Sequence, residues 1–236
     1  MTEIKDAQQS AYKPGAAIAN YWHTLLVLVL VGLNALRSAL QATSGVSNRP
    51  LVYLKIILFE WFVLAVVAVG VWMKKAPLET IFGQRWQSPL QFLRDIGLGI
   101  ALWFAALALV AILGGPHSGG QPDRGVAFLI PQTSFELSLW MVVAISAGIC
   151  EEAIYRGYFQ RQIAAIARSR IAGVLVSSAL FGAVHLYQGR GRALAIAASA
   201  ILYAVVVEWR GTVRPGMFAH ALQDGIAPVL LRLMRH

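Results

Sequence analysis

The stretch LSLWMVVAISAGICEEAIYRGYFQRQIAAI, residues 137–166, decides the fold of this chain. It is apolar over more than the roughly 20 residues that a membrane-spanning helix needs. Glu151 and Glu152 nevertheless lie side by side in its middle, and Arg156 follows one helical turn later. An ionisable residue at the centre of a membrane helix costs roughly 2.5 to 3.5 kcal/mol. The pair therefore indicates a functional site, and a buried ion pair in a soluble core helix is the alternative.

The amino-acid composition favours a membrane protein over a soluble one. Of the 236 residues, 58% are hydrophobic and 13% are charged, and the mean hydropathy is +0.62. Soluble domains carry about 25% charged residues. We therefore expect an all-α, polytopic transmembrane bundle of about seven spans. Cys150 is the only cysteine, which excludes an intrachain disulfide and gives no sign of a cysteine-ligated metal.

Seven apolar segments are predicted to be helices. We expect a polar N-terminal tail over 1–18, N-terminal membrane helices and loops over 19–136, and a catalytic core over 137–236. Ala76–Asp95 is predicted to be an interfacial loop, and Gly114–Pro131 a loop rich in glycine and proline. The predicted segments are Ala19–Leu36, Leu51–Met73, Ile96–Leu113, Leu137–Ile166, Ile171–Leu186, Ala193–Val207 and Met217–Met234.

The basic residues do not form one patch. The net charge is +9, but pairs such as Lys74 and Lys75, or Arg168 and Arg170, lie between the apolar segments. This is typical of the flanks of membrane spans, where Lys and Arg favour the cytoplasmic side. We expect the lipid bilayer as a partner and no nucleic acid. The distribution favours an integral, multi-pass protein of the bacterial inner membrane with a cytoplasmic N terminus.

Helix geometry separates the two glutamates. Residues four apart share a face, so Arg156 should lie over Glu152 and not over Glu151. Glu152 is then ionised and paired, while Glu151 is free for proton transfer. The alternative is that both glutamates only stabilise helix packing through Arg156.

Two further polar pairs follow in the next apolar segments. Phe181 and His185 are four residues apart, as are His220 and Asp224. A single histidine in an apolar helix is more often a satisfied interior hydrogen-bonding group than a catalyst. Two histidines, an aspartate and the two glutamates in consecutive membrane helices favour a common site.

These three motifs, Glu-Glu-x-x-x-Arg, Phe-x-x-x-His and His-x-x-x-Asp, resemble the signature of the CPBP family of intramembrane proteases. That family includes the type II CAAX prenyl proteases and the bacterial Abi proteins. The resemblance covers about Leu137–Met234 and implies a helical bundle around a water-filled cavity, with peptide-bond hydrolysis as the reaction. It implies that Glu151 and His185 activate the attacking water and that His220 and residue 224 stabilise the oxyanion. Phe181 would shape the cavity.

One motif position departs from the family. Asn is common there, and an ionised Asp224 accepts hydrogen bonds but cannot donate one to an oxyanion. Asp224 is expected to be protonated, to orient His220, or to bind a metal. We favour chemistry without a metal or other cofactor. Zinc is the alternative, and its ligands would be Glu151, His185, His220 and Asp224.

The expected substrate is a membrane-associated peptide or protein. Two other functions remain open from the residues alone. Intramembrane acids and histidines also build proton relays, so one rival is a proton-coupled carrier. The other is a non-catalytic membrane protein of the bacteriocin-immunity type. Glu60, in the middle of the second predicted span, either lines the cavity or forms a structural ion pair.

Overall fold

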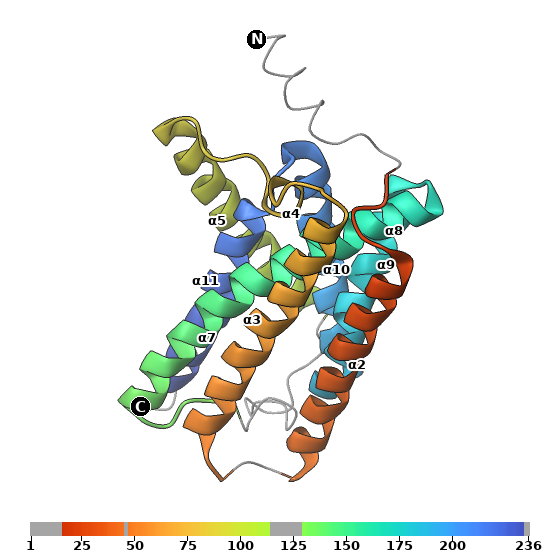
Figure 1. Cartoon of the computed structure of the whole chain (residues 1–236). Helices are drawn as coiled ribbons and strands as arrows, with labels where there is room; N and C mark the ends of the chain where they lie inside the picture. Colours follow the sequence, from red (N-terminus) through yellow and green to blue (C-terminus); the bar gives the residue numbers. More distant parts are fainter. Residues whose placement is uncertain (1–15, 45–46, 114–128, 234–236) are drawn as a thin grey trace.

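The computed structural model describes residues 16–44, 47–113 and 129–233, and these residues form helices without any strand (Figure 1). The prediction of an all-helical bundle is confirmed, since each predicted apolar segment corresponds to one helix or one continuous helical rod. Most of the predicted loop 114–131 lies outside the described residues, as does Met234. The elements are α2 (Tyr21–Ser44), α3 (Arg49–Met73), α4 (Glu79–Phe82), α5 (Pro89–Leu113), α7 (Ser134–Glu152), η1 (Ala153–Phe159), α8 (Gln160–Ala167), α9 (Arg170–Val184), η2 (Leu186–Gln188), α10 (Arg190–Arg210) and α11 (Arg214–Leu233).

The helices have the length and surface of membrane spans. In the described part of the chain, five segments are long and apolar enough to cross a bilayer: α2, α3, α5, the α7–η1–α8 rod and α10. Helix α9 is apolar but has only 15 residues. Large apolar side chains such as Leu33, Phe104 and Ile112 are more than half exposed. Lipid covers such surfaces without cost, so the chain is an integral membrane protein.

Helix α11 packs closely against two other long helices. It packs against both α5 and α7, while α3 packs against the other side of α7 (Figure 1). Glycines permit the close approach: a Cβ atom on Gly99 of α5 would lie 2.7 Å from Cβ of Phe218, and one on Gly148 of α7 would lie 2.8 Å from the carbonyl oxygen of Met217. Membrane helices associate through such small-residue contacts. They bring the polar face of α11 next to the end of α7.

The start of α2 is hydrogen-bonded to the C-terminal helices. The Oε1 atom of Gln162 in α8 accepts a hydrogen bond from the backbone nitrogen of Ile18 at 2.9 Å. Nδ1 of His23 lies 2.8 Å from the hydroxyl of Tyr158 in η1. Of the predicted polar tail, residues 1–15 lie outside the described residues, whereas Ile18 is buried.

The prediction of a loop over Ala76–Asp95 is wrong in part, because it contains α4 and the first turns of α5. Proline often interrupts a helix, but Pro89 begins α5, a position where its missing N–H does no harm. Asp95 is only 1% exposed. It pairs with Arg210 of α10 at 3.0 Å and accepts a hydrogen bond from Trp86 Nε1 at 2.8 Å. This residue therefore belongs to the packed bundle.

The glycine contacts predict different responses at two positions of α5. A Cβ on Gly99 would collide with α11, whereas one on Gly97 meets nothing within 4 Å. We expect Gly99→Ala to lower the free energy of unfolding by about 1 to 3 kcal/mol, as overpacking does. Gly97→Ala should leave it unchanged or raise it slightly, since alanine favours helix. Thermal unfolding in detergent measures both. Equal melting temperatures for the two variants would contradict the close contact between α5 and α11.

Candidate active site

The helix geometry changes at the two glutamates. Glu152 is the last residue of α7, and the chain then continues as the π-helical segment η1 before returning to α-helix at Gln160. Short π-helical insertions are rare and occur mostly at functional sites. Every residue of η1 is buried, including Arg156 at 1% exposure. The sequence pattern predicted an uninterrupted α-helix here, because local periodicity does not reveal the wider turn.

Glu152 is the centre of a buried ion cluster. Its Oε1 atom lies 2.9 Å from Nη1 of Arg156 and 3.0 Å from Nδ1 of His220, and the Glu152 side chain is fully buried. The predicted pairing of Arg156 with Glu152 is thus present. The contact with His220 joins residues 68 apart in the chain and was not predicted. A Cβ on Gly216 would lie 2.7 Å from Glu152 Oε2, so this glycine leaves room for the carboxylate.

The other ring nitrogen of His220 faces two more carboxylates. Nε2 lies 3.6 Å from Oε2 of Glu151 and 3.5 Å from Oδ2 of Asp224. Only a protonated imidazole can donate from both nitrogens. The Asp224 side chain is 35% exposed, whereas that of His220 is 10% exposed. Of the three roles considered for Asp224, its distance from the imidazole favours the one in which it orients His220.

His185 presents one nitrogen to the site. Its Nδ1 lies 2.7 Å from the carbonyl oxygen of Phe181, and because a carbonyl only accepts, Nδ1 donates and Nε2 is left for other partners. The Phe181 ring lies 4.8 Å from the His185 ring and 5.8 Å from the His220 ring, between centroids. The guanidinium carbon of Arg156 is 4.3 Å from the Phe181 centroid. Phe181 therefore packs between the two imidazoles and the arginine.

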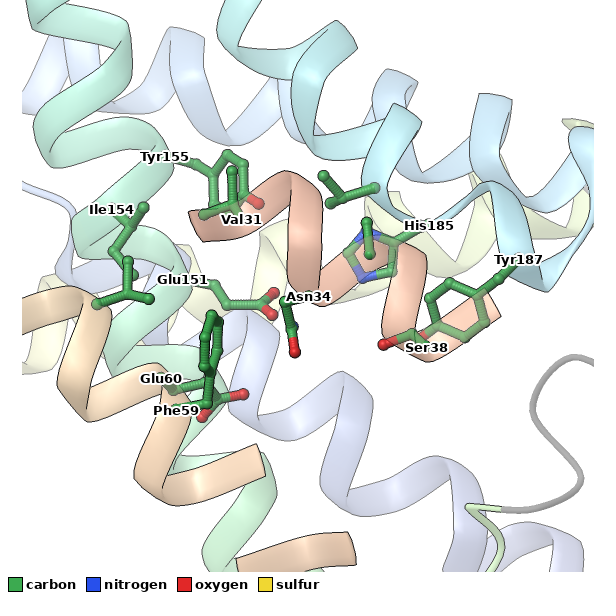
Figure 2. A pocket seen from close by; sticks show the side chains of 13 residues that line it. Val31, Asn34, Ser38, Phe59, Glu60, Glu151, Ile154, Tyr155, His185 and Tyr187 are labelled. Atoms are coloured by element: carbon green, nitrogen blue, oxygen red, sulfur yellow. The ribbon is translucent and has the colours of Figure 1, made fainter. Parts of the chain in front are cut away.

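Glu151 and His185 line one cavity of about 80 Å³ (Figure 2). One water molecule needs roughly 10 to 15 Å³ measured in this way, so the cavity has room for several. The Glu151 side chain is 24% exposed, in contrast to the buried Glu152. The remaining lining residues are Val31, Asn34, Ala35, Ser38, Phe59, Glu60, Val63, Ile154, Tyr155, Val184 and Tyr187. A carboxylate and an imidazole thus face the same cavity.

Sequence reasoning missed several polar residues of this cavity. Asn34 and Ser38 of α2 face it, and the Asn34 side chain lies next to Glu151 in Figure 2. The sequence signal for Asn34 is an asparagine within an apolar span. Because the predicted span ended at Leu36, this asparagine was placed at the end of a helix, where polar residues are ordinary, whereas α2 continues to Ser44. Tyr187 was also missed. Burial raises the pKa of Tyr187 to about 12, so its hydroxyl stays protonated at physiological pH.

Zinc, the alternative to metal-free chemistry, would have Glu151, His185, His220 and Asp224 as its ligands. Among the described residues, no three His, Cys, Asp or Glu side chains form a group that could hold a metal ion. Nδ1 of His220 is occupied by Glu152, so its Nε2, next to Glu151 and Asp224, is the nitrogen left for another partner.

The fold and site define a polytopic membrane protein with a cluster of glutamates and histidines among its helices. The family model described as type II CAAX prenyl endopeptidase Rce1-like matches residues 133–226. The match identifies an Rce1-like domain in this part of the chain, and the resemblance read from the three motifs is confirmed. No curated protein and no solved structure matches the chain. The helices before residue 133 lie outside the match, although α2 and α3 form part of the cavity wall.

The buried cluster predicts strong coupling between Glu152 and Arg156. We expect Glu152→Gln and Arg156→Met each to lower the free energy of unfolding by roughly 3 to 5 kcal/mol, because each leaves a buried charge without its partner. The free energy of unfolding of the double variant should fall by clearly less than the sum of the two single decreases. Unfolding in detergent, arranged as a double-mutant cycle, measures the coupling. Additive losses would show that the 2.9 Å contact contributes nothing.

Proposed function

We propose that the protein is an intramembrane endopeptidase that hydrolyses a peptide bond of a membrane-associated peptide or protein. The observation that supports this most is the division between the adjacent glutamates. Glu152 is held by Arg156 and His220, while Glu151 faces a water-sized cavity together with His185. A carboxylate beside water is the arrangement that general-base hydrolysis requires. The match to a prenyl endopeptidase family supports the same reaction.

In the proposed mechanism, a cavity water lies between Glu151 and Nε2 of His185. Glu151 takes a proton from this water as its oxygen attacks the carbonyl carbon of the scissile bond. His220, oriented by Glu152 at Nδ1, presents Nε2–H to the oxyanion that forms. Asp224 keeps the His220 ring in place from the exposed side and makes no contact with the oxyanion.

We further propose that the enzyme resides in the bacterial inner membrane with its N terminus in the cytoplasm. The grouping of lysine and arginine at the segment ends supports this orientation. The substrate would reach the cavity from the bilayer or its surface. The proposed partners are therefore lipid and a membrane-associated substrate, without nucleic acid.

Replacing the proposed base tests the function. Glu151→Gln keeps the side-chain volume but cannot accept the proton, so we expect a loss of hydrolysis of at least 100-fold with little change in stability. The assay uses purified protein in detergent and a fluorogenic peptide with a prenylated cysteine in a CAAX sequence. Membrane peptides from cells that express either protein are compared in parallel, which detects substrates without a prenyl group.

Glu79→Gln is the matched control, because Glu79 lies on α4 outside the cavity lining. It should hydrolyse the peptide at the wild-type rate. Activity of Glu151→Gln within about threefold of wild type would remove Glu151 from the mechanism. Identical peptide products with and without active protein, together with proton transport in liposomes, would favour a carrier instead.

The role of Asp224 predicts the outcome of a second substitution. Asp224→Asn should keep or raise activity, because the amide can both face His220 and donate a hydrogen bond. Chelator should have no effect on either protein. Loss of activity that added zinc restores, with stoichiometric zinc in the wild type by elemental analysis, would establish a metal mechanism and leave the protease assignment intact.

A further inference from the structure

Glu60 of α3 faces the same cavity. Its side chain is only 8% exposed, and it lines the cavity with Glu151 and His185. Its Oε2 atom accepts a hydrogen bond from the hydroxyl of Ser146 in α7 at 2.8 Å. Within the described part of the chain, this is the one hydrogen bond of the Glu60 side chain, and no ion pair reaches it. In Figure 2, the Glu151 carboxyl lies between His185 and Glu60.

The carboxyls of the site differ in how close a cation lies. Glu151, Glu152 and Asp224 each lie within 3.6 Å of Arg156 or His220, whereas Glu60 has no cation at that distance among the described residues. A buried carboxylate without a cation partner is costly, so a carboxyl in the position of Glu60 retains its proton.

Neighbours on its own helix do not supply the missing charge. Lys55, the nearest basic residue along α3, has an exposed side chain. Ser146 donates to Glu60 but carries no charge. Glu60 is thus a carboxyl group held in a fixed orientation, with its second oxygen left for the contents of the cavity.

From this arrangement we propose that Glu60 is a further catalytic residue, the general acid that protonates the leaving nitrogen of the scissile bond. The proposal rests on the proposed protease function. It gives the two cavity carboxyls opposite roles, with Glu151 taking the proton from water and Glu60 supplying one to the amine. Pairs of carboxyls with different environments divide acid and base work in this way in other hydrolases.

The step is balanced in atoms and electrons. Water oxygen bonds to the carbonyl carbon, its proton passes to Glu151, and the carbonyl π electrons move to the oxygen. An electron pair of the oxyanion then re-forms the carbonyl as the carbon–nitrogen bond breaks, the pair of that bond stays on nitrogen, and the proton of Glu60 bonds to that nitrogen. The products are a carboxylic acid and an amine. Proton transfer from Glu151 to Glu60 through cavity water restores the starting state.

A matched pair of substrates distinguishes a general acid from a structural residue. The probes are the fluorogenic prenylated CAAX peptide and its analogue with an ester in place of the scissile amide. An amide nitrogen must be protonated to leave, whereas an alkoxide leaves far more readily without it. We expect Glu60→Gln to lower kcat/KM for the amide about 100-fold or more. The decrease in kcat/KM for the ester should be at least tenfold smaller than the decrease for the amide. Glutamine still accepts the Ser146 hydrogen bond, so thermal stability should not fall.

If Glu60→Gln lowers kcat/KM equally for the amide and the ester, or hydrolyses the amide at the wild-type rate, Glu60 is not the general acid. If Glu60→Gln yields no folded protein, Ser146→Ala takes its place, and a loss that is larger for the amide again supports the proposal while equal losses overturn it. Glu151→Gln should lose hydrolysis of both the amide and the ester, because both reactions require an activated water molecule. A wild-type protein that cleaves neither probe nor any membrane peptide would refute the protease function itself, which separates the two failures.

Discussion

The carboxylate of Glu152 lies fully buried where α7 becomes η1, and one of its oxygens contacts both Arg156 and His220. A charge in this position is tolerable only while its partners stay in contact with it. Arg156 follows Glu152 in the same continuous helical rod, but His220 belongs to α11. The buried carboxylate therefore has both of its partners only when α11 packs against α7. The glycines at positions 148 and 216 allow α11 to come close enough. Stability and the orientation of the catalytic imidazole therefore depend on the same contact.

Four carboxyl groups of similar intrinsic chemistry have different surroundings. Glu152 is enclosed and paired, Glu151 lines the cavity, Asp224 lies at the partly exposed edge, and Glu60 has a single hydroxyl partner among the described residues. In a low-dielectric interior, small differences in distance to a cation decide which group is ionised. The geometry of the helices, more than the residue types, therefore sets what each carboxyl of the site can do.

The cavity extends beyond the part of the chain that matches the Rce1-like family. Residues 133–226 supply Glu151 and His185, but Asn34 of α2 and Glu60 of α3 complete the wall. The hydrogen bonds that tie the start of α2 to α8 and η1 hold this wall against the core. The N-terminal helices α2 and α3 are therefore part of the cavity wall, together with the Rce1-like domain.

The sequence by itself determined the helical class, the membrane setting and the pairing of Arg156 with Glu152. Composition and a four-residue spacing are local properties, and a helix converts them directly into faces. It did not determine that His220 meets Glu152 or that Glu60 lines the same cavity as Glu151. Those outcomes depend on how closely distant helices approach, which glycine contacts and buried charges decide only when the whole bundle is assembled. Periodicity along one helix contains no information about the helix that will lie against it.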